Sequence, residues 1–276
     1  MLLKDQLTQA RILLNKTEKI AIPREVIKLQ QLLNTQDFPD ISELVNVIGQ
    51  NTLLAGEVVQ AANKPSMQGN NPRDIHTIRD AIDILGIRRL KNLITAIALK
   101  QGVEDFGHDQ LLQHSVKVAE TAAEIAKYVD SVSADEAYLL GLFHNIGAFM
   151  MTRLDPAYET VFTKSLSAPY STTELELDTY HTTHGMVGVL VAEAWNLDAS
   201  FRKTMILHHD RNLGSIKTPE LKRLVALIQL ANALVSESVF QVYVTEELKQ
   251  MLKTTADTLG LSEEALAAIR IGMLAS

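Results

Sequence analysis

Histidines in helix-like apolar patterns are the residues of this chain with the clearest capacity for chemistry. Eight are present, and six of them fall between positions 114 and 209. Neutral imidazoles that project from several helices of a bundle can ligate a divalent metal ion in the bundle interior. The six histidines, with the acid that follows the last of them, are His114, His144, His181, His184, His208 and His209-Asp210.

The elements that must position these side chains are helices. Apolar residues recur at three- and four-residue steps along nearly the whole chain, beginning with a stripe from Leu3 to Leu14. There is no convincing strand pattern and no fixed-period repeat. The sequence therefore predicts an all-α helical bundle, with further helices over 24–34, 41–49, 53–63, 78–85, 88–100, 110–129, 134–153, 173–195, 200–209, 219–237, 245–258 and 262–274.

Breaks and caps in this pattern indicate how the chain is divided. The segment QGVEDFGHDQ at 101–110 is the best boundary, and it predicts an N-terminal helical subdomain over 1–107 and a second over 108–276. The segment is too short for a flexible tether, so the two parts are expected to pack together. Ser133 and Ser171 each precede a glutamate by three residues, which predicts capping boxes at two helix starts.

Composition excludes several classes of function. The net charge is −7 and the pI about 5.6, so a general affinity for nucleic acid or for an anionic membrane is not expected. There are no cysteines, which rules out disulfides and thiolate-metal sites. The N-terminus is too charged for a signal peptide, and no apolar stretch is long enough to cross a bilayer. We expect a cytoplasmic protein.

One segment, GLFHNIG, resembles the G-L-x-H-D-I-G motif of the HD superfamily of metal-dependent phosphohydrolases. In that superfamily a distant histidine, the His-Asp pair and a later aspartate hold the metal. By chain order His114 matches the first histidine and His144 the paired one. Asn145 stands at the position of the paired aspartate, and Asn232 stands at that of the later one.

The chain as a whole resembles the HDOD family, non-catalytic relatives of the HD hydrolases found in bacterial signalling proteins. The resemblance covers roughly residues 20–235 and departs from the family pattern at 50–52, at Lys64 and at Asp198. It implies an HD-like helical core with an N-terminal helical subdomain. Four segments carry it: IPREVIKLQQLL, LVNVIGQNTLLAGEVVQAANKPS, IRDAIDILGIRRLKNLI and HGMVGVLVAEAWNLDASFRKTMILHHD.

Two amides in place of two acids weaken the case for catalysis. A hard cation such as Mg²⁺ or Mn²⁺ needs the negative charge of carboxylate ligands. Without that charge, the free energy of metal binding should weaken by several kcal/mol. We therefore expect no cofactor and no hydrolase activity, although His114, His144 and His208 could still bind a late transition metal weakly. As an alternative to any ligand role, these histidines are hydrogen-bonded core residues, and His181, His184, His209 and Asp210, the remaining pocket candidates, serve in packing and helix capping.

Three functions remain open from the sequence. The first is a regulatory module that binds other signalling proteins, which is the one we predict. The second is a residual phosphohydrolase acting on a nucleotide or cyclic dinucleotide, against which Asn145 and Asn232 argue. The third is a sensor that binds a nucleotide without hydrolysing it, for which Arg153 and Lys203 are the nearest basic residues along the sequence.

Overall fold

The computed structural model describes residues 3–17, 20, 22–35, 39–68, 73–104, 109–130 and 132–275. Within these ranges the regular structure is helical and contains no strand, which confirms the predicted fold class. Contacts between Cα atoms divide the chain into two compact units, Ile20–Asp105 and a larger one made of Met1–Lys19 with Phe106–Ser276. No helix in the described ranges is long and apolar enough to span a membrane.

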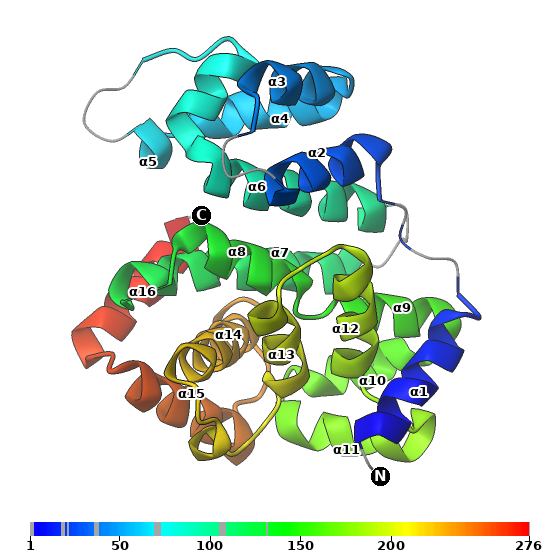
Figure 1. Ribbon diagram of the computed structural model, residues 1–276. Coiled ribbons are helices and arrows are strands. Elements are labelled where there is room, and N and C mark those ends of the chain that lie inside the picture. Colours follow the sequence, from blue (N-terminus) through cyan, green and yellow to red (C-terminus); the bar gives the residue numbers. More distant parts are fainter. Residues whose placement is uncertain are drawn as a thin grey trace. The chain divides into compact units, whose positions relative to one another are not determined.

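The smaller unit is organised around α6, against which α2, α3 and α4 pack (Figure 1). Gly86 interrupts α6 with a φ of 70°, a backbone conformation that glycine adopts without strain. This interruption confirms the predicted pair of helices on either side of Gly86. The helices of this unit are α2 (Arg24–Thr35), α3 (Ile41–Gly49), α4 (Thr52–Ala62), α5 (Pro65–Gln68) and α6 (Ile78–Glu104).

The larger unit surrounds α14 (Pro219–Ser238), which packs against α7, α8, α13 and α15 (Figure 1). Every residue of α14 from 224 to 236 is buried, including the polar Gln229, Asn232 and Ser236, as expected for a helix enclosed by its neighbours. Its remaining elements are α1 (Leu3–Leu14), α7 (Asp109–Ile125), η1 (Ala126–Tyr128), α8 (Ala134–Phe143), α9 (Ile146–Leu154), α10 (Tyr158–Ser165), α11 (Pro169–Tyr180), α12 (His184–Ala194), α13 (Ala199–Leu207), η2 (Leu213–Ser215), α15 (Glu246–Leu259) and α16 (Glu263–Ala275).

Helix α1 differs from the predicted division of the chain. We expected residues 1–107 to form one subdomain, but α1 packs on α12 and α9 of the larger unit. Its buried face includes Ala10 and Leu14, and the Thr182 hydroxyl donates a hydrogen bond to the carbonyl of Gln6 at 2.9 Å. The sequence correctly predicts that one face of α1 is buried. The spacing of its apolar residues does not predict which helices cover that face.

The two predicted capping boxes had different outcomes. Ser133 caps α8, since its Oγ accepts the N–H of Glu136 at 3.2 Å. Ser171 caps nothing, because Pro169 already begins α11 two residues earlier. Its hydroxyl instead donates to Glu247 of α15 at 2.7 Å.

Candidate functional site

His144 and Asn145 lie at a helix break that the sequence did not predict. The expected helix 134–153 is two helices, α8 and α9, with His144 and Asn145 between them. Both side chains are buried, and His144 Nδ1 lies 2.5 Å from the carbonyl oxygen of Gly141. Gly147 lets α9 lie against α12: a Cβ there would come within 1.8 Å of the His184 carbonyl oxygen. The glycine therefore brings the His144 turn close to the start of α12.

A second break separates the two histidines that were expected to share a helix face. His181 has a left-handed backbone (φ 56°) at the end of α11, and α12 begins at His184. His184 is buried, whereas His181 is exposed and its Nδ1 lies 3.3 Å from the Leu177 carbonyl oxygen. The prediction that His181 belongs to the pocket is wrong, because the αL turn directs the two side chains apart.

The end of α13 supplies two more histidines. His208 and His209 are both buried, and His208 Nδ1 lies 2.7 Å from the carbonyl oxygen of Met205. Asp210 is not buried with them: its carboxylate accepts the Asn212 N–H at 2.8 Å and so stabilises the turn that follows. The structure therefore leaves Asp210 outside the buried cluster, and its side chain forms a turn and does not cap α13.

Five buried histidines thus form one contiguous cluster. The ring centroids of His114 and His144 are 5.7 Å apart, and those of His144 and His208 are 5.4 Å apart. His208 lies 4.1 Å from His209 and 5.0 Å from His184, and the last two rings are 4.9 Å apart. The cluster joins residues from α7, the α8–α9 turn, α12 and the end of α13.

Asn145 and Asn232 lie at the His114 end of this cluster. The Asn145 amide donates to His114 Nδ1 at 3.4 Å, a long hydrogen bond. The Asn232 side chain interacts with His114 and opposes the lowering of its pKa by burial. Nε2 of His144 and Nδ1 of His209 are buried without a hydrogen-bond partner, which is unusual in a folded interior.

Four imidazoles of the cluster are held in the neutral form. Burial lowers the pKa of His114 to about 4 and that of His208 to about 3. Burial, followed by the neighbouring imidazoles, lowers the pKa of His144 and of His209 well below the usual value. These four rings are therefore neutral at pH 7, which is the form that binds metal ions.

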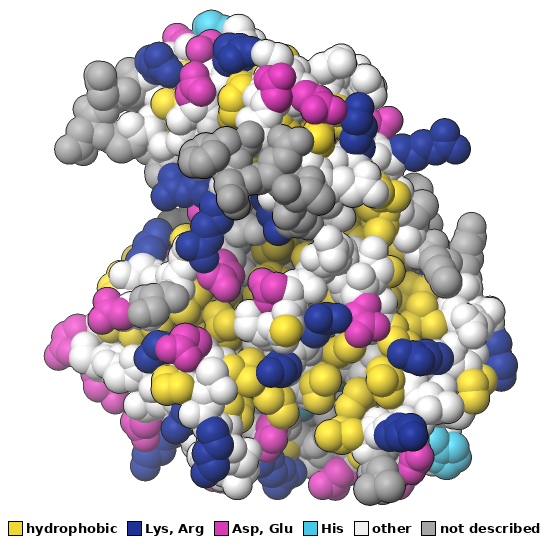
Figure 2. Space-filling view, viewed as in Figure 1, with side chains coloured by type: hydrophobic (Ala, Val, Ile, Leu, Met, Phe, Trp, Pro, Cys, Tyr) yellow, Lys and Arg dark blue, Asp and Glu magenta, His cyan; other side chains and the backbone are white. Residues whose placement is uncertain are grey.

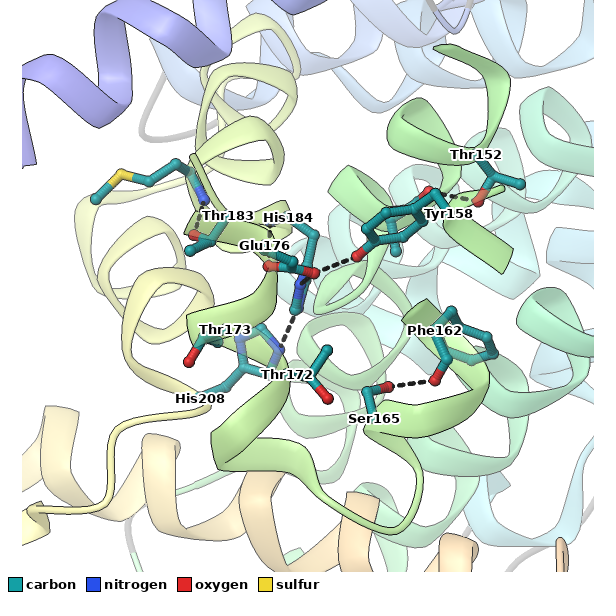
Figure 3. A network of polar contacts seen from close by, with 12 residues as sticks. Thr152, Tyr158, Phe162, Ser165, Thr172, Thr173, Glu176, Thr183, His184 and His208 are labelled. Carbon is teal, nitrogen blue, oxygen red and sulfur yellow. Dashed lines mark hydrogen bonds and ion pairs between the residues drawn. The ribbon is translucent and has the colours of Figure 1, made fainter. Parts of the chain in front are cut away.

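Sequence reasoning missed a buried carboxylate beside the cluster. Glu176 on α11 has no exposed surface and accepts hydrogen bonds from the Tyr158 hydroxyl and from the backbone N–H of His184 at 3.0 Å (Figure 3). His184 Nδ1 lies 2.7 Å from the same carboxylate. Burial, and then the charge of Glu176, raise the pKa of Tyr158 well above its usual value, so the phenol stays protonated as a donor. No sequence signal marks Glu176, because it is one of several acids in a mixed helix.

Hydrogen bonding fixes the ring tautomers. A carbonyl oxygen only accepts, so the Nδ1 atoms of His144 and His208 carry the proton and their Nε2 atoms are lone pairs. Glu176 accepts from Nδ1 of His184 in the same way. The Nε2 atoms of His184 and His208 are 3.1 Å apart, which is within hydrogen-bond distance (Figure 3).

Comparison with known proteins places this site in a family. The HDOD domain family profile matches residues 20–211. The chain belongs to the HDOD domain family. The matched range includes every histidine of the cluster, whereas Asn232 lies beyond it.

Relatives of known structure share the fold. An HDOD domain protein of unknown function from Geobacter sulfurreducens is 22% identical, with a TM-score of 0.69 over 98% of this chain and 97% of that one. A protein from Shewanella amazonensis, named provisionally as a metal-dependent phosphohydrolase, is 17% identical, with a TM-score of 0.64 over 96% and 99% of the two chains. At these sequence identities the structural similarity shows a shared fold alone.

A third solved structure and one curated protein are also similar to this chain. A protein from Marinobacter aquaeolei, named provisionally for signal transduction, is 18% identical, with a TM-score of 0.67 over 100% of this chain and 66% of that one. An uncharacterized protein of Treponema pallidum is 25% identical over 260 residues, which is 88% of this chain and 49% of that protein. The chain thus spans about half the length of this curated relative.

The metal ion of the HD relatives does not fit the equivalent residues here. His114, His144, Asn145 and Asn232 offer imidazoles and amides, which bring no negative charge to a hard divalent cation. Among the described residues Glu176 is the one buried carboxylate, and its oxygens already accept from Tyr158 and His184. The residues at these positions therefore do not fit a metal ion that would support hydrolysis.

Neither basic residue considered for a nucleotide is buried with the histidines. Lys203, one of the two basic residues considered for a nucleotide, is exposed on α13, and Arg153 at the end of α9 is half-buried. The prediction that Lys203 lies beside the histidines is not supported by its exposure.

Proposed function

We propose that this chain is a non-catalytic regulatory module that acts in signal transduction by binding other signalling proteins. One observation carries the proposal: Asn145 and Asn232 stand where the HD hydrolases have acidic metal ligands, beside a buried histidine cluster in which His114 and His208 are neutral. The positions His114, His144, Asn145, His208 and Asn232 are then remnants of an ancestral metal site.

The low exposure of the cluster also supports a non-catalytic role. The exposed fractions of its five histidines range from 0% for His144 to 8% for His209. A phosphoester would have to displace packed helices to reach these rings, and packed interiors resist such displacement. A closed, neutral cluster supports a structural or regulatory role better than turnover.

The molecular surface is compatible with protein partners. On the face shown in Figure 2, acidic and basic side chains are interspersed, with apolar side chains between them over the larger unit. Binding of nucleic acid requires a face dominated by basic residues. A protein interface needs no such bias, because interfaces are on the whole about as apolar as the rest of a protein surface.

An assay of hydrolysis with matched variants tests the catalytic half of the proposal. The purified chain is incubated with Mg²⁺, Mn²⁺ or Fe²⁺ and a panel of nucleotides, cyclic dinucleotides and a generic phosphodiester. We expect no metal-dependent turnover above the metal-only blank. The variant Asn145→Asp with Asn232→Asp restores both acids and should gain affinity for Mn²⁺, because two negative charges return to the site. Metal-dependent turnover by the unaltered chain would contradict the proposal.

Crosslinking in the native cells tests the regulatory half. Partners captured by this chain are compared with those captured by an unrelated helical protein of similar size and charge. We expect enrichment of proteins with kinase, receiver or other signalling domains. Enrichment of none of these over the control would remove the support for a signalling role.

A further inference from the structure

Helix α1 is attached to the larger unit by few side chains. Its buried residues are Gln6, Ala10 and Leu14, and Leu3 at its start is 66% exposed. By contrast, every residue of α9 from 146 to 152 is buried. A helix of 12 residues is marginal on its own in water, so α1 stays folded through this narrow contact.

The surface beneath α1 is apolar and adaptable. Figure 1 shows α1 beside α9 and α12, the two helices on which it packs. Methionine side chains are flexible and repack around different shapes, and they are common on surfaces that accept several partners. Without α1 this surface would be an exposed apolar patch, which usually marks an interaction site. We call it the α9–α12 face, and its residues are Met150, Met151, Leu154 and Val187.

The buried stripe of α1 shows what the α9–α12 face accepts. Gln6, Ala10 and Leu14 recur at four-residue steps, so they lie along one side of the helix. Ala10 has no exposed surface, and its small side chain lets the two helices approach closely at the centre of the contact. Lys4 and Arg11 are exposed to solvent. Another amphipathic helix with a small residue between apolar ones at this spacing would fit the same face.

The contact of α1 reaches the turn that begins α12. The Thr182 hydroxyl, which is fully buried, donates to the Gln6 carbonyl oxygen at 2.9 Å. Thr182 lies between α11 and α12, two residues before His184. Loss of α1 would leave this hydroxyl without its acceptor, and a buried polar group without a partner is unfavourable. The exchange of α1 for another helix would therefore change the surroundings of His184.

We propose that the α9–α12 face is the docking surface for an amphipathic helix of a signalling partner, and that α1 covers this face until such a helix displaces it. This inference rests on the proposed function, because it names the surface and the kind of partner for the same regulatory role. Helix α1 precedes residues 20–211, which match the HDOD profile, so its displacement leaves the matched part of the chain in place. Because α1 is tethered beside the face, the covered form predominates until a partner helix competes with it.

Binding of a labelled peptide to the full chain tests this docking surface. The probe is a fluorescein-labelled peptide of residues 3–17, LKDQLTQARILLNKT, which reproduces α1. The chain variant Ala10→Glu places a charge in the buried stripe and should free the face, so the peptide should bind it roughly 10-fold or more tightly than the unaltered chain. Ile12→Glu is the matched control, because Ile12 is 45% exposed and the same charge there should leave peptide binding unchanged. A peptide that itself carries Ala10→Glu should bind neither variant.

Hydrogen–deuterium exchange of the unaltered chain is a second measurement, and it decides if the Ala10→Glu chain does not fold. The amides of α1 should exchange through local opening, at least about 10-fold faster than those of α9 and α12. Exchange of all three helices at one common rate overturns the proposal. A folded Ala10→Glu chain that binds the peptide no better than the Ile12→Glu chain overturns it as well. Phosphodiester turnover would contradict the proposed regulatory function alone, because neither of these measurements depends on catalysis.

Discussion

Replacing Glu176 by glutamine tests the buried hydrogen-bond network most directly. The carboxylate accepts from three donors: the Tyr158 hydroxyl, the His184 backbone N–H and His184 Nδ1. Glutamine keeps the size of the side chain but turns one oxygen into an amide that can only donate. In either orientation of the amide, at least one of these buried donors then faces another donor.

The expected loss follows from these contacts. One unsatisfied buried donor costs about 1–3 kcal/mol, and the remaining bonds lose their charge assistance, which is worth about 1 kcal/mol each. Removing a buried charge recovers part of its desolvation cost. We expect Glu176→Gln to lower the free energy of unfolding by about 2–4 kcal/mol, and the melting temperature by roughly 5–10 °C.

The assay is chemical and thermal unfolding in the presence of a chelator, so that bound metal does not contribute. Glu174→Gln is the matched control, since Glu174 is exposed on the same helix and should change stability by less than about 0.5 kcal/mol. Tyr158→Phe removes one of the three donors and should couple to Glu176→Gln in a double-mutant cycle. If both glutamate variants unfold alike, the network does not stabilise the fold as argued.

Two further predictions concern helix packing and pH. Gly147→Ala should lower the free energy of unfolding by more than the 1–3 kcal/mol or so that is usual for overpacking, because its Cβ would meet α12 backbone atoms at 1.8, 2.6 and 2.8 Å. Gly56→Ala, at an exposed position of α4 where a Cβ meets nothing within 4 Å, should instead raise the free energy of unfolding by up to about 1 kcal/mol. Equal effects of the two variants would refute the packing argument. For His114 the folded pKa of about 4 lies below the ordinary 6.5, so the unfolded state protonates first. Its contribution to stability is complete above pH 6.5 and declines by about 3 kcal/mol as pH falls to 4. Urea unfolding at several pH values, with chelator present, should show a shallower decline in His114→Gln, and parallel profiles would contradict a neutral, buried His114.

Much of the fold follows from local patterns. Helical periodicity predicted the class and most elements, and the break at Gly86 was visible because glycine punctuates a helix. The expected helix over 219–237 closely matches α14, the central buried helix of the larger unit. Motif order also identified His114 and His144 as neighbours, and the structure places their rings 5.7 Å apart.

Other features could not be predicted because they depend on contacts between distant segments. The periodicity of α1 shows that one face is buried, but not that α9 and α12 cover it. The spacing of His181 and His184 suggested a shared face, yet one residue in the αL conformation separates them. A single turn changes the direction of a side chain without changing the apolar pattern around it.

The sequence by itself determined an all-helical HDOD protein with amides at the two positions that would need acids. Only the tertiary structure decided which histidines converge, and that Glu176 and Tyr158 join them from α11 and α10. The physical reason is that a helix specifies side-chain directions over one or two turns. The cluster depends on hydrogen bonds and close helix contacts between residues as far apart as 114 and 209.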